Sequence, residues 1–194
     1  MPSRPTLILT GYRATGKSTV ARALAEPLGL AFLDLDLVLE ERIGMPIRDF
    51  VAAQGWPAFR ARERALLEEL AGQDGYLLAT GGGAILHQEI WPRLMENGFV
   101  AWLRAAPEII AARLAADPVS GTQRPSLTGT GIVEEIVAVL SEREPLYRQG
   151  SHLAVEAARP LAEVAETIRT AYLACVAARE ENASTTNKPG PAPA

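Results

Sequence analysis

Cysteine and histidine are nearly absent from this sequence of 194 residues. The single cysteine, Cys175, lies in an apolar stretch, and there are only two histidines. One cysteine cannot form a disulfide framework, and this composition also excludes a Cys/His metal cluster. It suits the reducing cytoplasm, where we expect the protein to act.

Long hydrophobic runs and an excess of basic charge are also missing. The apolar run near the N-terminus is short, and no window approaches the roughly 20 residues of a membrane span. With 19 basic and 23 acidic residues the net charge is −4, so the chain lacks the basic excess of a nucleic-acid-binding protein. We expect a monomer with small-molecule partners and no contact with nucleic acid or membrane.

Lysine is scarce as well, with only Lys17 and Lys188 among the 19 basic residues. Lys17 belongs to the segment 11–18, Gly-Tyr-Arg-Ala-Thr-Gly-Lys-Ser, which has the phosphate-loop spacing of glycine, four residues, then Gly-Lys-Ser/Thr. A wide planar guanidinium cannot replace a compact ammonium at phosphate oxygens, so a lysine retained here indicates a functional requirement. The alternative is a tight strand-to-helix turn that holds no ligand.

This phosphate loop predicts a site for a nucleoside triphosphate. An apolar strand at 6–10 precedes it and a helical pattern at 17–28 follows, so backbone N–H groups and the positive end of the helix dipole would face phosphate oxygens. Lys17 would reach the β- and γ-phosphates, and Ser18 would ligate Mg²⁺. The loop residues expected at ATP are Gly11, Arg13, Ala14, Thr15, Gly16, Lys17, Ser18 and Thr19.

Strand and helix patterns alternate along the rest of the chain. We expect strands at 31–35, 76–79, 99–103 and 152–155, and helices at 37–43, 46–54, 56–70, 87–97, 107–115, 132–147 and 161–178. Such alternation predicts an α/β protein with a parallel sheet, which binds ligands at the carboxyl ends of its strands. Residues 1–179 are long enough for a single domain with one core.

Two segments lack such patterns. Residues 116–130 are polar, rich in glycine, proline, serine and threonine, and carry Arg124. They are too long for an ordinary connection, which predicts a mobile lid. Residues 180–194 have a composition that cannot bury a core, which predicts a disordered tail.

Two groups at predicted strand ends could take part in phosphoryl transfer. Asp34 and Asp36 project the same way and suit Mg²⁺ or substrate hydroxyls, although a solvated turn with a helix cap would use the same residues. The glycines at 81–83 would let the backbone approach a ligand closely, or would serve only as a hinge.

Arginines are the remaining candidates for binding an anionic substrate. Arg60, Arg124 and Arg143 lie at suitable places, but each alone has the pattern of an ordinary surface arginine. His87 and His152 belong to no nucleophile or metal-ligand pattern, and we interpret both as structural.

Six motifs, taken together and in this order, resemble the shikimate kinase family. They are the phosphate loop, Asp34-Leu35-Asp36, Phe59-Arg60-Ala61-Arg62-Glu63, Thr80-Gly81-Gly82-Gly83, Arg124-Pro125-Ser126-Leu127-Thr128-Gly129 and Arg143-Glu144-Pro145-Leu146-Tyr147. The resemblance covers residues 5 to about 175, and the longer lid is similar to that of the second bacterial isoform. It implies a three-layer P-loop kinase fold, a five-stranded parallel sheet of order 2-3-1-4-5, and transfer of the ATP γ-phosphate to the 3-hydroxyl of shikimate with Mg²⁺.

The resemblance also implies a role for each matching residue. Lys17, Asp34 and Arg124 would be catalytic, with Asp34 beside Mg²⁺ as the candidate base. Arg60 and Arg143 would clamp the substrate carboxylate, because a planar guanidinium pairs bidentately with a carboxylate. The implied shikimate contacts are Asp36, Phe50, Phe59, Arg60, Gly81, Gly82, Gly83 and Arg143, and the further ATP contacts are Arg113, Arg124 and Arg159.

Three other functions compete with this interpretation. A gluconate kinase of the same fold would also need the phosphate loop and a lid arginine, but the three-glycine loop and the Arg143 motif argue against it. A GTPase-type switch would need an Asn-Lys-x-Asp guanine reader, whereas Asn187-Lys188 is followed by Pro189-Gly190. A non-catalytic nucleotide-binding scaffold is disfavoured because the carboxylate pair and both clamp arginines are present.

Overall fold

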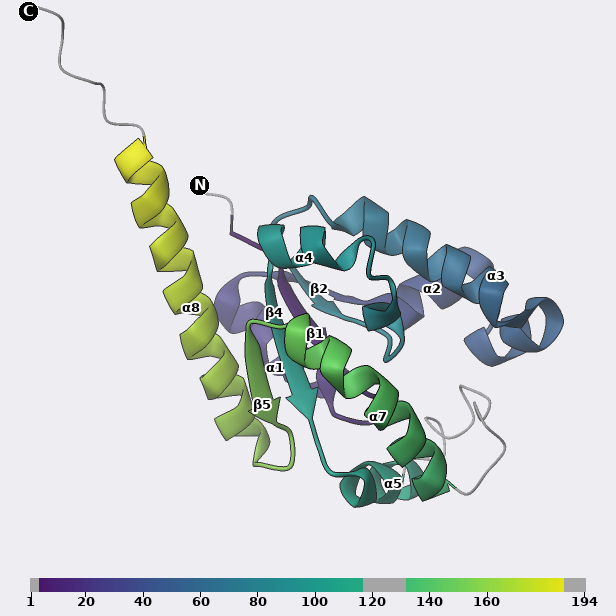
Figure 1. Ribbon diagram of the computed structural model, residues 1–194. Helices are drawn as coiled ribbons and strands as arrows, with labels where there is room; N and C mark the ends of the chain where they lie inside the picture. The colour runs from purple at the N-terminus through teal and green to yellow at the C-terminus, as the bar shows by residue number, and fades with distance from the viewer. Residues whose placement is uncertain (1–3, 117–131, 187–194) are drawn as a thin grey trace, which may run out of the picture.

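The computed structural model describes residues 4–116 and 132–186 (Figure 1). Its five strands are β1 (Leu7–Thr10), β2 (Ala31–Asp34), β3 (Tyr76–Ala79), β4 (Phe99–Arg104) and β5 (Leu153–Glu156). The helices are α1 (Lys17–Leu28), α2 (Leu35–Ile43), α3 (Ile47–Leu70), α4 (Trp91–Asn97), α5 (Pro107–Ala116), α7 (Ile132–Gln149) and α8 (Leu161–Thr186), with a short 3₁₀ turn, η1 (Ala84–Leu86).

The strands form one parallel sheet in the order β2-β3-β1-β4-β5, which confirms the predicted topology. Ile8 of β1 is in register with Leu78 of β3 and Val100 of β4. Because every strand runs the same way, all the carboxyl ends meet at one edge of the sheet. The phosphate loop, Asp34 and the glycine loop after β3 therefore emerge side by side.

Helices cover both faces of the sheet, as the predicted three-layer fold requires (Figure 1). Alternate residues along each strand point to opposite faces. In β1, Ile8 packs in the core with α2, α3 and α4, while Leu7 and Leu9 pack in the core with α1 and α8. A third cluster, which includes Tyr12, joins α5 to α7 beyond the carboxyl end of β4.

Helix boundaries differ from the sequence-based expectation in three places. Helix α3 joins two predicted helices, with a kink at Gly55, whose φ of 80° and ψ of 165° are not helical. The predicted helix 87–97 begins only at Trp91. The prediction that the tail begins at residue 180 is wrong for residues 180–186, because α8 continues to Thr186.

Helix α8 is tied to the rest of the fold near its end. The guanidinium of Arg179 donates to the backbone carbonyls of Glu96, Asn97 and Gly98 at the C-terminal end of α4, which gives this turn of α8 a docking point. Residues 187–194 of the predicted tail and residues 117–130 of the predicted lid lie outside the described residues. Within the described ranges, none of the helices has the length and apolar character needed to cross a membrane.

Candidate active site

The phosphate loop takes its shape from glycine. Gly11 has a φ of 137°, and a Cβ at this position would lie closer than 3.0 Å to the carbonyl oxygen of Leu103. Gly16 has a φ of 93° immediately before α1. Only glycine adopts these conformations without strain, so the loop curls tightly from β1 into the start of α1.

Lys17 lies across the inside of this loop. Its Nζ donates to the carbonyl oxygens of Gly11 at 2.9 Å and Tyr12 at 2.8 Å, and the residue is only 9% exposed. The hydroxyl of Thr15 donates to the same Tyr12 carbonyl at 2.8 Å. The ammonium is therefore held beside the N-terminus of α1, where phosphate oxygens bind in loops of this type.

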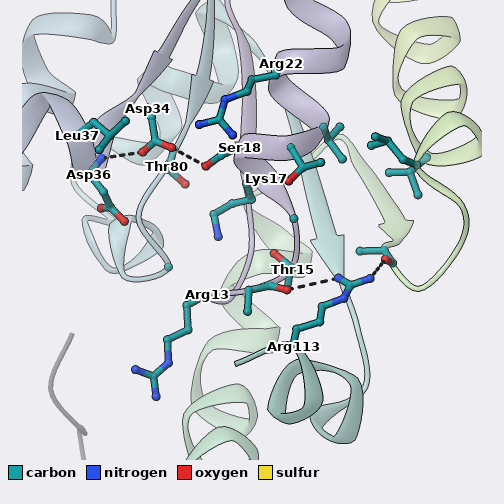
Figure 2. Close-up of a pocket in the computed structure, with 18 of the residues that line it drawn as sticks. Arg13, Thr15, Lys17, Ser18, Arg22, Asp34, Asp36, Leu37, Thr80 and Arg113 are labelled. Carbon is teal, nitrogen blue, oxygen red and sulfur yellow. Dashed lines mark hydrogen bonds between the residues drawn. The ribbon is translucent and has the colours of Figure 1, made fainter. Parts of the chain in front are cut away.

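Ser18 and Asp34 come together as the sequence predicts. The Ser18 hydroxyl donates to Oδ2 of Asp34 at 2.5 Å, and Oδ1 accepts from the backbone N–H of Asp36 at 3.2 Å (Figure 2). Asp34 is therefore also the N-cap of α2, so the helix cap and the site share one carboxylate. Figure 2 shows Asp36 beside them, on the side of the cleft that faces Lys17.

A cleft of about 680 Å³ opens over these residues. It extends from Asp34, Asp36 and Ile47 on one side to Arg113 and Arg159 on the other. The lining residues from the phosphate loop and α1 are Arg13, Ala14, Thr15, Gly16, Lys17, Ser18, Thr19, Val20 and Arg22. The cleft is thus long enough to hold a phosphate chain between two different ends.

Two arginines mark one end of this cleft. Arg113 of α5 donates to the carbonyls of Ala14 at 3.3 Å and Ala157 at 2.7 Å, which joins the phosphate loop to the segment after β5 (Figure 2). Arg159 follows in that segment and lines the same end. Both predicted nucleotide contacts therefore lie beyond the phosphate loop on the side away from Asp36.

Arg13 takes a different direction from the rest of the loop. Its guanidinium pairs with Glu135 of α7 at 2.9 Å and points away from Lys17 and Ser18 in Figure 2. Arg13 lines the cleft, but its charged group connects the phosphate loop to α7. Arg124, the other arginine expected at the phosphates, lies outside the described residues.

Arg60 lies directly against the glycine loop. A Cβ on Gly83 would fall closer than 3.0 Å to three atoms of the Arg60 guanidinium, so only glycine leaves space for it. The guanidinium is paired with Glu63 and lies 5.2 Å from the ring centroid of Trp56. Glu63 is 2% exposed and also contacts Nε2 of His87 at 3.0 Å.

Arg143 approaches the same loop from α7. It donates to the carbonyl oxygen of Gly82 at 3.0 Å, and the hydroxyl of Tyr147 donates to that oxygen at 2.6 Å. Burial raises the pKa of Tyr147, although Arg143 acts in the opposite direction, so Tyr147 stays a hydrogen-bond donor at all ordinary pH values. The two predicted clamp arginines thus converge on adjacent glycines.

Phe50 and Phe59, the two aromatic residues expected around the substrate ring, differ in how deeply they are buried. Phe59 is fully buried in the core and stacks edge-on with Trp56. Phe50 is half-buried at the margin of the same core. Phe59 therefore supports Arg60 from behind, with its ring 5.5 Å from the guanidinium, and Phe50 keeps an accessible edge.

Sequence reasoning missed three residues that shape this site. Glu63 contacts Arg60 and His87, and Tyr147 donates to the glycine loop. The sequence motifs contain Glu63 and Tyr147 without giving either a role of its own, and His87 was interpreted only as structural. A signal existed for Glu63, because it follows Arg60 by one helical turn. His87 carried no comparable signal, since its partner lies 24 residues away in the chain.

The phosphate loop, the facing carboxylates and the sheet order define a P-loop kinase. Comparison with known proteins extends this: the shikimate kinase family model matches residues 13–172. The chain belongs to the shikimate kinase family. It is 41% identical to a shikimate kinase 2 from Yersinia enterocolitica over 84% of this chain and 92% of that protein, and 44% identical to a shikimate kinase from Nitratidesulfovibrio vulgaris over 87% and 95%.

Solved structures agree with this assignment. A shikimate kinase from Acinetobacter baumannii in complex with shikimate matches 88% of this chain and 94% of its own, with a TM-score of 0.81 and 33% identity. A gluconokinase from Sinorhizobium meliloti matches with a TM-score of 0.55 and 18% identity, which shows a shared fold alone.

Proposed function

We propose that this protein transfers the γ-phosphoryl group of ATP to the 3-hydroxyl of shikimate. The observation that carries the proposal is the convergence of Arg60 and Arg143 on the glycine loop, across from the phosphate loop. Two guanidinium groups in fixed positions suit a small ring bearing one carboxylate. Family membership and the likeness to a shikimate complex support the same substrate.

Phosphoryl transfer of this kind depends mainly on positioning and charge stabilisation. Lys17 would exchange its two carbonyl partners for phosphate oxygens and stabilise the charge that develops on the transferring group. Asp36 would accept hydrogen bonds from substrate hydroxyls. Asp34 lines the same cleft and would be the candidate to accept the proton of the attacking hydroxyl, although a loose transition state needs little help from a base.

The residues present fit Mg²⁺. Ser18 and Asp34 offer hard oxygen donors at the lining of the cleft, and Mg²⁺ in kinases is typically held by one or two such groups together with substrate phosphates. The described residues contain no group of three acidic, histidine or cysteine side chains that could hold a metal by themselves, which agrees with this mode. When bound, Mg²⁺ would neutralise phosphate charge.

Arg113 and Arg159 would hold the nucleotide base and ribose end of ATP. Arg113 is already fixed by its two carbonyl partners, so its guanidinium plane would pack on adenine by cation–π contact. We further propose that the protein works as a cytoplasmic monomer and uses no partner beyond ATP and shikimate.

A coupled assay of ADP release tests this proposal. Shikimate should support turnover, whereas gluconate in its place and GTP in place of ATP should not. Arg143→Ala should raise the KM for shikimate by at least about tenfold, the scale of one lost charge-assisted pair. Arg148→Ala is the matched control, because Arg148 is on the same helix but is exposed and pairs with Glu144. Turnover with gluconate but not shikimate would overturn the assignment.

A further inference from the structure

His87 lies behind the substrate arginine rather than in the cleft. Its Nε2 is 3.0 Å from Oε2 of Glu63, and the guanidinium of Arg60 contacts that same oxygen. The side chain of His87 is 8% exposed and that of Glu63 is 2% exposed. One buried carboxylate oxygen is therefore shared between a titratable imidazole and the arginine that faces the substrate.

We propose that His87 is a positioning residue that acts through Glu63 on Arg60, so that protonated His87 strengthens the binding of the substrate carboxylate. This inference rests on the proposed function, because it takes Arg60 as a carboxylate ligand. It adds a residue to the substrate site that touches neither substrate nor nucleotide.

The charges around His87 give the direction of this effect. With neutral His87, the charges of Arg60 and Glu63 cancel, and protonation leaves the buried trio with one net positive charge. Histidine is the side chain that changes charge in the physiological range, whereas a substrate carboxylate stays ionised there. An approaching carboxylate is therefore attracted more strongly when His87 is protonated than when it is neutral.

The other charged groups near His87 lie at the surface. Oε1 of Glu89 is 3.8 Å from Nδ1 of His87, and Arg64 lies 3.5 Å from that same Oε1. Arg64 also pairs with Glu68 at 3.0 Å. These three side chains are about half exposed, so solvent screens their charges and Glu63 remains the main charged partner of His87.

Hydrogen bonding acts in the same direction as charge. A protonated His87 donates from Nε2 to Glu63 with a charge-assisted bond and presents Nδ1–H toward Glu89. The shared oxygen of Glu63 is then held more strongly by His87 and less by Arg60. The N–H groups of Arg60 are correspondingly more available to a substrate carboxylate.

The test is the pH dependence of shikimate affinity in the wild type and in His87→Gln. Glutamine can still donate to Glu63 but cannot become charged. Affinity is measured without nucleotide, so that ionisation of ATP does not contribute. The readout is intrinsic tryptophan fluorescence, to which Trp56 beside Arg60 contributes together with Trp91 and Trp102. The KM for shikimate and kcat are measured in parallel between pH 5.5 and 8.5.

The wild type should lose affinity about threefold to tenfold between pH 5.5 and pH 8.5, the range in which histidine side chains lose their proton, because the attraction of one screened unit charge near the ligand is lost. His87→Gln should show the weaker, high-pH affinity throughout, with kcat within about twofold of wild type. His152→Gln is the matched control, because the other histidine of the sequence accepts from the backbone N–H of Val100 instead of contacting Glu63, and its replacement should leave the wild-type profile unchanged.

Glu89→Gln supplies a second variant that is exposed and should fold in any case. Removing the carboxylate beside Nδ1 should move the midpoint of the affinity profile to lower pH. A wild-type profile that is flat, or that is unchanged in both variants, overturns this inference while leaving the kinase assignment intact. If the wild type neither binds nor phosphorylates shikimate at any pH, the proposed function itself has failed.

Discussion

Replacing Gly83 by alanine would displace the guanidinium of Arg60 without removing it. The substitution therefore tests whether the position of this group matters for substrate binding. Gly83 has a φ of −102° and a ψ of −2°, which alanine adopts without backbone strain. The added methyl group would nevertheless lie closer than 3.0 Å to the Arg60 guanidinium, where ordinary contacts are 3.4–4 Å. The guanidinium must therefore move, while the backbone of the glycine loop can stay in place.

The size of the effect follows from this displacement. A shift of about 1 Å in a positioning group can cost up to about a hundredfold, so we expect the KM for shikimate to rise about tenfold to a hundredfold. The guanidinium is the end of a flexible side chain, and Glu63 retains His87 as a partner. The free energy of unfolding should therefore fall by less than about 2 kcal/mol.

Steady-state kinetics and thermal unfolding measure these two effects. Gly72→Ala is the matched control, because a Cβ there meets nothing within 4 Å, and its kinetics should be unchanged. Added to Arg60→Ala, the Gly83 substitution should cause no further loss, since the group it displaces is already gone. An unchanged KM in folded Gly83→Ala, or full additivity with Arg60→Ala, would refute this account of the clamp.

Three further predictions concern the loop, the carboxylate and pH. Lys17→Ala should lower kcat by at least about a hundredfold in a protein that still folds, because it removes a positive charge that stabilises the transition state. Near-normal turnover in the folded variant would contradict the kinase assignment. Asp34→Asn should keep the α2 cap but reduce kcat more than it changes the shikimate KM, and an unaltered kcat would remove Asp34 from the mechanism. Burial, with Arg179 adding to it, lowers the pKa of His152, whose Nδ1 accepts from the Val100 N–H. As pH falls, His152 therefore takes up a proton at a higher pH in the unfolded chain than in the folded one, and the free energy of unfolding should decline below about pH 6.5. The melting temperature should fall less between pH 7.5 and pH 5.5 in His152→Gln than in the wild type. An equal fall in both proteins would show that His152 is not the cause.

The parts of the fold that follow from local chemistry could be predicted from the sequence. The phosphate loop needs glycine and lysine at fixed spacing, and the alternation of strands and helices limits the sheet to a parallel one. For Asp34 the sequence left a helix cap and a place in the site as alternatives, whereas in the structure the same carboxylate caps α2 and accepts from Ser18. These features depend on neighbours in the chain, so their pattern is visible in the sequence.

Features that depend on distant partners could not be predicted in the same way. Arg60 and Arg64 lie one turn apart on the same face of the helix, so periodicity does not distinguish them, whereas of the two only Arg60 contacts the glycine loop, 20 or more residues away in the chain. The burial of Glu63 follows from the same packing. The last helix continues past residue 178 although its final turns, Asn-Ala-Ser-Thr-Thr, are weak helix formers, so composition placed its end too early.

The scarcity of lysine in the sequence has a practical consequence for chemical labelling. Apart from the amino terminus, Lys17 and Lys188 are the only primary amines that the sequence provides. An acylating reagent therefore has few positions to modify, and one of them is the ammonium held by the carbonyls of Gly11 and Tyr12. Intact-mass spectrometry of the labelled protein would count modified amines directly. Protection of a single amine by added nucleotide would then report occupancy of the catalytic loop without any reporter group or assay of turnover.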